Sequence, residues 1–146
     1  MPLQQTFIDG VTKTMNIVHR AALRVTGGRV GTKVFGMPAV ELHTIGRKSG
    51  QRRSVMLTAP IQEPDRVVLV ASKGGDDRHP DWYRNLVDHP DVELTQGGVT
   101  TPMRARTAEA AEKADLWPQI VAAYKGYAGY QRRTDRDIPV VICEPR

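Results

Sequence analysis

Residues 44–53 read Thr44-Ile45-Gly46-Arg47-Lys48-Ser49-Gly50-Gln51-Arg52-Arg53, and the predicted fold is built around them. It links an apolar run over residues 40–45 to another over residues 53–59, and its two glycines allow a tight reversal. We therefore expect a β-hairpin with a basic turn. Its four cations and uncovered turn amides suit a ligand that carries phosphate and carboxylate groups. The alternative is a solvated hairpin tip, because runs of charge usually face water.

A second glycine turn, Ala71-Ser72-Lys73-Gly74-Gly75, follows the continuous apolar run over residues 67–71. A run without alternation predicts a strand that is buried on both faces. Further along, Gly97-Gly98 separates predicted strands over residues 92–96 and 101–107. A last apolar run covers residues 138–143, where Pro139 indicates an edge strand or a strand start.

Three helices are expected. Apolar residues at spacings of three and four predict the first over residues 7–25. It should pack on its own domain, with peripheral membrane contact as the alternative, because residues 1–33 hold five cations and one anion. A short helix should cover residues 81–89, with Pro80 at its first turn. The last should run from about residue 108 to 124, with a kink or restart at Pro118.

This arrangement predicts a mainly β fold with flanking helices, of the α+β class. Six short strands joined mainly by tight turns, without β-α-β alternation, argue against a Rossmann sheet. A small antiparallel barrel with helices on its outside fits better. At 146 residues, the chain should form one domain with one core.

The composition narrows the chemistry. A net charge of +5 favours an anionic partner. The single cysteine, Cys143, suits a reducing compartment, and the lack of a long apolar run or leader predicts a cytoplasmic protein. Scattered histidines predict no metal site, and no Walker or nucleophile-elbow spacing occurs. No helix-turn-helix or RNA-binding pattern occurs either, so nucleic acid is not expected as a partner. The chain is poor in catalytic groups, which is expected if a bound cofactor carries the chemistry.

Three tyrosines recur every three residues, at Tyr124, Tyr127 and Tyr130. On one helix they would share a face, and flat side chains with hydroxyl tips suit a pocket over a planar ring. Packing of one helix edge on the core is the alternative. Gly126 and Gly129 make a rigid helix there less favourable.

The motifs Thr44–Gly50, Ala71–Gly75 and Pro80–Leu86, together with the tail from Trp117 to Pro139, resemble the deazaflavin-dependent nitroreductase and oxidoreductase family of actinobacteria. The likeness runs from about residue 36 to 145. It implies a split β-barrel like that of FMN-binding oxidases, formed by residues 31–146, with residues 1–30 as a helix of the same domain. It also implies coenzyme F420, a deazaflavin with a phosphate and a polyglutamate tail.

The resemblance also implies a role for each matching residue. The phosphate and tail would meet Arg47, Lys48, Ser49 and Arg53. The other cofactor-binding positions would be Ser54, Val55, Met56, Leu57 and Thr58 on one strand, Ala71, Ser72, Lys73 and Gly74 in the second turn, Asp81, Trp82, Asn85 and Leu86 on the short helix, and Tyr127. Ser72, Tyr124, Tyr127 and Tyr130 match positions that face the electron-accepting substrate.

The implied activity is hydride transfer from reduced F420 to a small electron-poor acceptor: a quinone, an enone or coumarin-type lactone, or a nitroaromatic. At two places this chain departs from the nitroreductase pattern, and both departures affect which acceptor it would reduce. The nitroreductase pattern has Pro-Leu-Tyr where this chain has Met56-Leu57-Thr58, and an apolar residue at Asp81. The alternatives are an FMN-dependent reductase of the same fold and a non-catalytic deazaflavin-binding protein. Either a monomer or a homodimer is compatible with the sequence.

Overall fold

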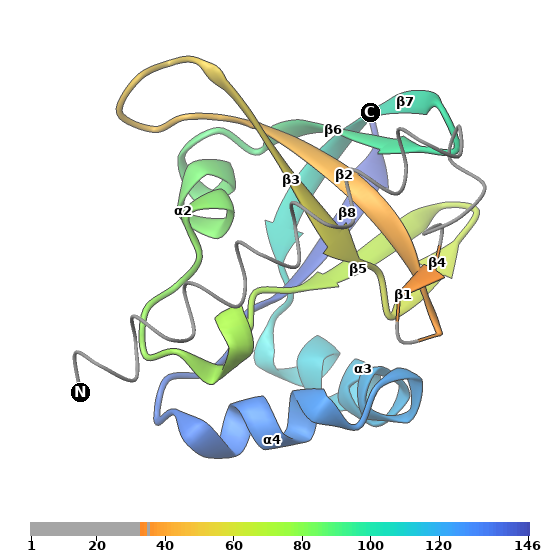
Figure 1. Ribbon diagram of the computed structural model, residues 1–146, viewed down its shortest axis with the longest axis vertical. Helices are drawn as coiled ribbons and strands as arrows, with labels where there is room; N and C mark the ends of the chain where they lie inside the picture. The colour runs from red at the N-terminus through yellow and green to blue at the C-terminus, as the bar shows by residue number, and fades with distance from the viewer. Residues whose placement is uncertain (1–32, 35) are drawn as a thin grey trace.

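The protein is described by a computed structural model over residues 33, 34 and 36–146. Within them, eight antiparallel strands form one curled sheet, with three α-helices and a short 3-10 helix around it (Figure 1). The strands are β1 (Lys33–Val34), β2 (Met37–Ile45), β3 (Arg52–Thr58), β4 (Ile61–Glu63), β5 (Arg66–Val70), β6 (Asp91–Gln96), β7 (Val99–Thr107) and β8 (Val140–Pro145). The helices are η1 (Lys73–Gly75), α2 (Asp81–Asp88), α3 (Ala110–Ala123) and α4 (Gly126–Arg133).

Both predicted hairpins are present. β2 pairs with β3 from Ala39 opposite Thr58 to Ile45 opposite Arg52, so the basic turn joins two long strands. β6 pairs with β7 around Gly97-Gly98. The prediction of six strands is wrong in number, because β1 and β4 are two and three residues long. Strands that short carry no readable alternation.

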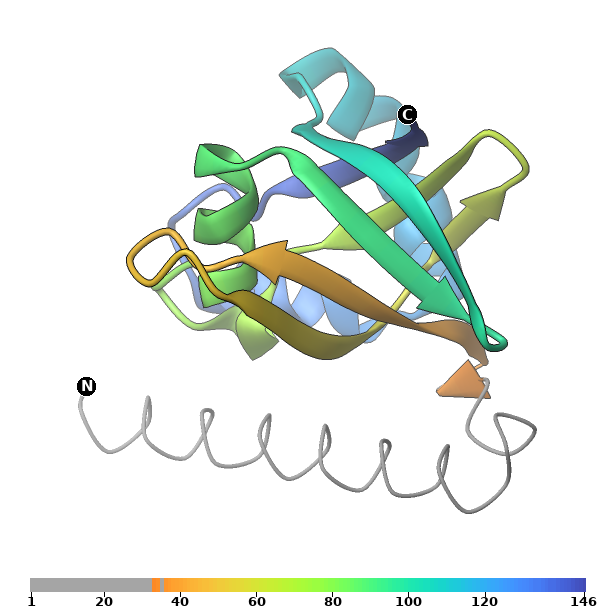
Figure 2. The ribbon, with the colours of Figure 1, turned by 90° about the horizontal axis from the view of Figure 1, so that it is seen from above.

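The sheet is open along one seam. Its order is β1-β2-β6-β7-β8-β5-β4, and β3 pairs with β2. The edges at β3 and β4 are consecutive in the chain, and the turn between them is fastened by a hydrogen bond of 2.8 Å from Ala59 N–H to Pro38 carbonyl. In Figure 1, β2 and β3 cross in front of β5 and β8, and in the view from above in Figure 2, β6 and β7 cross in front of the same two strands. The predicted antiparallel split barrel with outer helices is therefore confirmed.

Two apolar clusters explain how the helices sit. Alternate residues of β5 point in opposite directions: Val67 and Leu69 belong to the cluster inside the barrel, while Val68 and Val70 belong to a second cluster. The second cluster includes Ile120 of α3 and Tyr127 of α4. The predicted burial of this strand on both faces is confirmed. The same packing fixes α4, with its tyrosines, against the outside of the barrel.

The structure corrects two details. Of the kink or restart expected at Pro118, the restart is wrong, because α3 passes through Pro118 as one helix. A proline removes the donor to the carbonyl four residues earlier, and here both Pro118 and Ala114 are exposed, so water can satisfy that carbonyl. Pro139 precedes β8, as a strand-start residue should. The edge alternative is wrong, since β8 lies between β7 and β5.

The predicted helix over residues 7–25, and the membrane contact assigned to it, lie outside the described residues. No helix in the described part of the chain is both long and apolar enough to span a bilayer.

Candidate cofactor site

The basic turn has a fixed backbone. Gly46 N–H donates to the Gln51 carbonyl and Gly50 N–H donates to the Gly46 carbonyl, both at 2.8 Å. Gly50 adopts a φ of +70°, where a side chain would be strained. The Ser49 hydroxyl accepts a hydrogen bond from Gln51 N–H at 3.2 Å. Six residues therefore reverse the chain between β2 and β3.

Arg47 anchors this turn to α2. Its backbone N–H and its Nη1 both donate to Asn85 Oδ1, at 3.2 and 3.0 Å, and its Nη2 lies 3.3 Å from Asp81 Oδ1. The buried Asn85 amide also donates to Thr44 Oγ1 at 3.2 Å. The Arg47 side chain is only 16% exposed. Arg47 thus holds the turn in place, and its predicted contact with phosphate, like that of its neighbours, stays a prediction.

Those neighbours keep their charge available. Lys48, Ser49 and Arg53 are exposed, and Arg53 Nη2 is 3.5 Å from Ser49 Oγ. Arg52 instead forms an ion pair with Glu93 at 3.3 Å. Within the part of the chain that the structure describes, neither Lys48 nor Arg53 forms an ion pair. The turn therefore presents two uncompensated cations to solvent.

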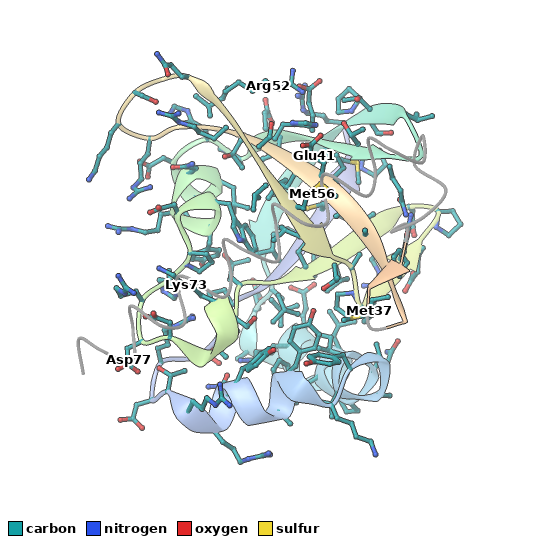
Figure 3. The ribbon with its side chains drawn as sticks, viewed as in Figure 1. Met37, Glu41, Arg52, Met56, Lys73 and Asp77 are labelled. Atoms are coloured by element: carbon teal, nitrogen blue, oxygen red, sulfur yellow. The ribbon has the colours of Figure 1, made fainter. Side chains whose placement is uncertain are left out.

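The predicted cofactor residues of β3 lie on two faces. Val55 and Leu57 pack against the cluster inside the barrel. Met56 lies opposite Glu41 of β2, on the face that also carries Ser54 and Thr58 (Figure 3). The pleat thus places Val55 and Leu57 on one face of β3 and Met56 on the other. Their predicted contact with the cofactor ring stays a prediction.

The second glycine turn forms η1, whose Lys73, Gly74 and Gly75 all have positive φ, at 46°, 64° and 86°. Lys73 is the one described non-glycine residue with this conformation. Such backbone strain is typical of functional sites. Before it, Ser72 is 9% exposed, and its hydroxyl makes no hydrogen bond within the described residues. A buried hydroxyl without a protein partner is costly unless a water or a ligand bonds to it.

η1 is packed directly against α4 (Figure 1). A Cβ placed on Gly75 would lie 2.9 Å from the Tyr130 carbonyl oxygen and 3.0 Å from Arg133 Cβ. Arg133 Nη1 donates to the Gly74 carbonyl at 3.3 Å, and Thr134 Oγ1 donates to Asp77 Oδ1 at 2.8 Å. The loop with Ser72 and the helix with the tyrosines therefore form one packed unit.

The three tyrosines meet, although they do not share one helix. Tyr124 caps the end of α3, while Tyr127 and Tyr130 lie on α4. The ring centroids of Tyr124 and Tyr127 are 5.4 Å apart, those of Tyr127 and Tyr130 6.1 Å, and those of Tyr124 and Tyr130 6.3 Å. The break falls at Tyr124, whose backbone is extended, while Gly126 begins α4 and Gly129 lies inside it. The three tyrosine rings nevertheless come together, because the chain bends between α3 and α4.

Both tyrosines of α4 have a raised pKa. Burial raises the pKa of Tyr127, whose hydroxyl shares a hydrogen bond of 3.1 Å with Thr58 Oγ1. Burial and the Tyr124 hydroxyl raise the pKa of Tyr130 to about 12. Both phenols are therefore protonated at neutral pH and can donate hydrogen bonds.

The four α2 residues that were predicted to bind the cofactor lie on different faces of the helix. Trp82 and Leu86 join the cluster inside the barrel. Asn85 is buried beneath the basic turn, and the Asp81 side chain is 83% exposed. Of the four, Asp81 and Asn85 contact the turn directly, and both do so through Arg47.

Sequence reasoning missed three polar residues near the site. The buried Asp76 carboxylate accepts three hydrogen bonds from Arg78, the shortest at 2.8 Å, and these hold its pKa below the usual range. The Arg136 side chain spans the loop before α2. His43 of β2 is buried, with Nδ1 2.6 Å from Ser54 Oγ and Nε2 2.7 Å from Thr95 Oγ1. For Asp76, the signal was an Asx turn, an aspartate that accepts from the N–H two residues on.

No set of three potential metal ligands occurs among the described side chains.

Comparison with known proteins identifies the family. A family model described as F420H(2)-dependent quinone reductase matches residues 16–145. A Mycobacterium tuberculosis (strain H37Rv) protein named F420H(2)-dependent quinone reductase is 42% identical over 137 residues, which cover 88% of this chain and 89% of that protein. A Mycobacterium bovis protein named as a putative F420H(2)-dependent quinone reductase matches to the same extent.

Two solved structures agree. One, described as an F420-H2 dependent reductase (FDR-A), has 44% sequence identity and a TM-score of 0.66, and the match covers 73% of this chain and 94% of that one. Another, described as a domain-swapped dimer, has 40% identity and a TM-score of 0.68, over 87% of this chain and 96% of that one. The resemblance that the sequence motifs indicated is confirmed, and the chain belongs to the F420H(2)-dependent quinone reductase family.

Proposed function

We propose that this chain uses reduced coenzyme F420 to reduce a quinone. The names of its relatives support F420H2 as the donor and a quinone as the acceptor. The observation that carries the proposal is the buried Ser72 hydroxyl, which lacks a partner in the described residues and lies beside the strained η1 turn. A polar group buried in this way suits a bound ring with a carbonyl oxygen.

The residues of the basic turn suit the anionic part of F420. Lys48 and Arg53 carry the uncompensated charge, and Ser49 adds a hydroxyl. Phosphate and carboxylate groups bind well to such donors. FMN has a phosphate but no acidic tail, so the excess of cations favours F420. In this arrangement Arg47 holds the turn on α2 through Asn85.

The ring should lie near β3, η1 and α4. We assign Ser54, Met56 and Thr58 to it because they share one face of β3 and because Thr58 reaches Tyr127. Figure 3 labels Met56 on β3 and Lys73 on η1. When bound, reduced F420 supplies the hydride. The protein's part is to hold donor and acceptor together and to keep water away from them.

Ser72 and the tyrosines are assigned to the acceptor. A quinone gains negative charge on its oxygen as it is reduced, and fixed O–H donors stabilise that charge. Tyr127 and Tyr130 can donate because burial keeps them protonated. Tyr124 shares this cluster through its 3.5 Å contact with the Tyr130 hydroxyl. Thr58 leaves more room next to Tyr127 than the tyrosine of the nitroreductase pattern, which favours a bicyclic quinone over a nitroaromatic.

The test is steady-state oxidation of F420H2 under anaerobic conditions with a naphthoquinone, a nitroaromatic and a coumarin-type lactone at equal concentrations. We expect the highest kcat/KM for the quinone. Ser72→Ala should lower kcat/KM by about ten-fold or more, as the loss of one oxyanion donor does. Thr101→Ala, which removes an exposed hydroxyl on β7, is the matched control and should have little effect. Turnover of none of the three acceptors, with F420 bound, would make the chain a deazaflavin carrier.

A further inference from the structure

Arg136, in the segment between α4 and β8, binds the loop that carries Ser72. Its Nη2 donates to the carbonyls of Ala71 and Ser72 at 3.2 and 2.9 Å, and its Nε donates to the Asp76 carbonyl at 2.8 Å. Its Nη1 lies 3.0 Å from His79 Nδ1, which accepts if the proton is on Nε2. One planar guanidinium thus holds both ends and the middle of the loop over residues 71–79, here called the cofactor loop.

The cofactor loop needs such a support because little regular structure holds it. Lys73, Gly74 and Gly75 follow one another with positive φ, a conformation that costs energy at Lys73. A hydrogen bond to the Ser72 carbonyl fixes the peptide between Ser72 and Lys73, and so the direction of the Lys73 N–H. Fixed turn amides and a strained backbone are features that bind anionic or carbonyl oxygens.

Arg136 also joins two parts of the proposed site. It follows α4, which carries Tyr127 and Tyr130, and it reaches across to Ser72. The same segment contributes Thr134, whose hydroxyl binds Asp77. The cofactor loop and α4 therefore keep their relative position through side chains from one short stretch. Arg136 is partly buried, and burial lowers its pKa without removing its charge, since a guanidinium stays protonated.

We propose that Arg136 is a positioning residue for the cofactor: it holds the backbone of Ala71–Asp76 in the conformation that receives F420. The proposal rests on the proposed function. No direct contact of Arg136 with cofactor or acceptor is invoked, and its effect passes through Ser72 and the peptide that follows it. Lysine cannot replace it fully, because a compact ammonium cannot reach acceptors on three sides at once.

The experiment compares Arg136→Met and Arg136→Lys with the control Arg106→Met. Arg106 also forms several charged hydrogen bonds, to Glu112 and Glu144, but it joins β7 to α3 and β8 away from the cofactor loop. Three quantities are measured: the Kd for F420 by fluorescence titration, the free energy of unfolding in urea, and the rate of trypsin cleavage after Lys73 followed by mass spectrometry.

We expect Arg136→Met to raise the Kd for F420 by about ten-fold or more and Arg136→Lys to give an intermediate value. Cleavage after Lys73 should become faster in the same order without F420. Arg106→Met should lose stability but keep the wild-type Kd and cleavage rate. If Arg136→Met does not fold, the lysine variant gives the result, since an unchanged Kd and cleavage rate in Arg136→Lys would contradict the proposal.

The outcomes separate the two proposals. A wild-type protein that does not bind F420 would overturn the proposed function and this inference with it. A wild-type protein that binds F420, together with Arg136 variants that bind it equally well or an Arg106→Met variant that loses as much affinity, would overturn this inference alone.

Discussion

Replacing Gly75 by alanine tests whether η1 and α4 form one packed unit. Gly75 has a φ of +86°, and an added Cβ would lie 2.9 Å from the Tyr130 carbonyl oxygen. The backbone conformation alone costs about 1–2 kcal/mol for a residue with a side chain. The contact with backbone adds about 1–3 kcal/mol, because the Tyr130 carbonyl can move only with α4. We expect Gly75→Ala to lower the free energy of unfolding by about 2–5 kcal/mol.

Gly97→Ala is the matched control. Gly97, at the tip of the β6–β7 hairpin, also has a positive φ, +58°, but a Cβ added there would have no atom within 4 Å. Gly97→Ala should therefore lower the free energy of unfolding only by the cost of the backbone conformation, about 1–2 kcal/mol. Urea unfolding followed by circular dichroism measures both losses. Gly75→Ala should also lower kcat/KM for the quinone, because it shifts Tyr130 relative to Ser72. Equal losses of stability in the two variants, with wild-type kinetics, would refute the packing argument.

Four further predictions follow from single contacts. Tyr127→Phe should lower quinone turnover roughly ten-fold or more, with a smaller change in the Kd for F420, because it removes a fixed donor; the reverse pattern in the two assays would place this tyrosine beside the cofactor. Asn85→Ala should cost about 1–3 kcal/mol in urea unfolding and raise the Kd for F420, because it leaves the partly buried Arg47 N–H without an acceptor; an unchanged Kd would mean that the turn does not bind the cofactor. Burial, followed by two nearby guanidinium groups, lowers the pKa of His79. The unfolded chain then binds a proton more readily, so the free energy of unfolding should fall as pH drops below about 6.5, and His79→Gln should flatten that slope. Burial raises the pKa of the Cys143 thiol to about 12, so a thiol reagent should label it in urea and leave it unlabelled in the native state at mildly alkaline pH.

The hairpins could be predicted from sequence because local signals set them. Glycines flank the basic turn, Gly97-Gly98 separates β6 from β7, and the continuous apolar run of β5 indicates burial on both faces. The shortest strands could not be predicted, because two or three residues carry no periodicity. The run through Pro118 could not be predicted either, since it depends on which side of α3 faces water.

The residues of the candidate site could be predicted from the sequence, but much less of their arrangement in space could be. The basic turn pointed to an anionic ligand, yet the engagement of Arg47 with Asn85 joins residues 38 positions apart and leaves no local trace. The tyrosine spacing suggested one helical face. In the structure the rings meet because the chain bends between α3 and α4. Arg136 was visible only as part of a motif, and its role depends on backbone carbonyls that carry no sequence signal.

The cofactor assignment is tested most directly by a parallel fluorescence titration of the purified full chain with F420 and with FMN. We predict selective binding of F420, with an affinity that falls in Lys48→Ala and Arg53→Ala, since these exposed cations have no ion-pair partner in the described part of the chain. Thr101→Ala should bind like the wild type. Tighter binding of FMN, or affinity for F420 that neither lysine nor arginine removal changes, would contradict the assignment of the basic turn to the acidic end of the cofactor.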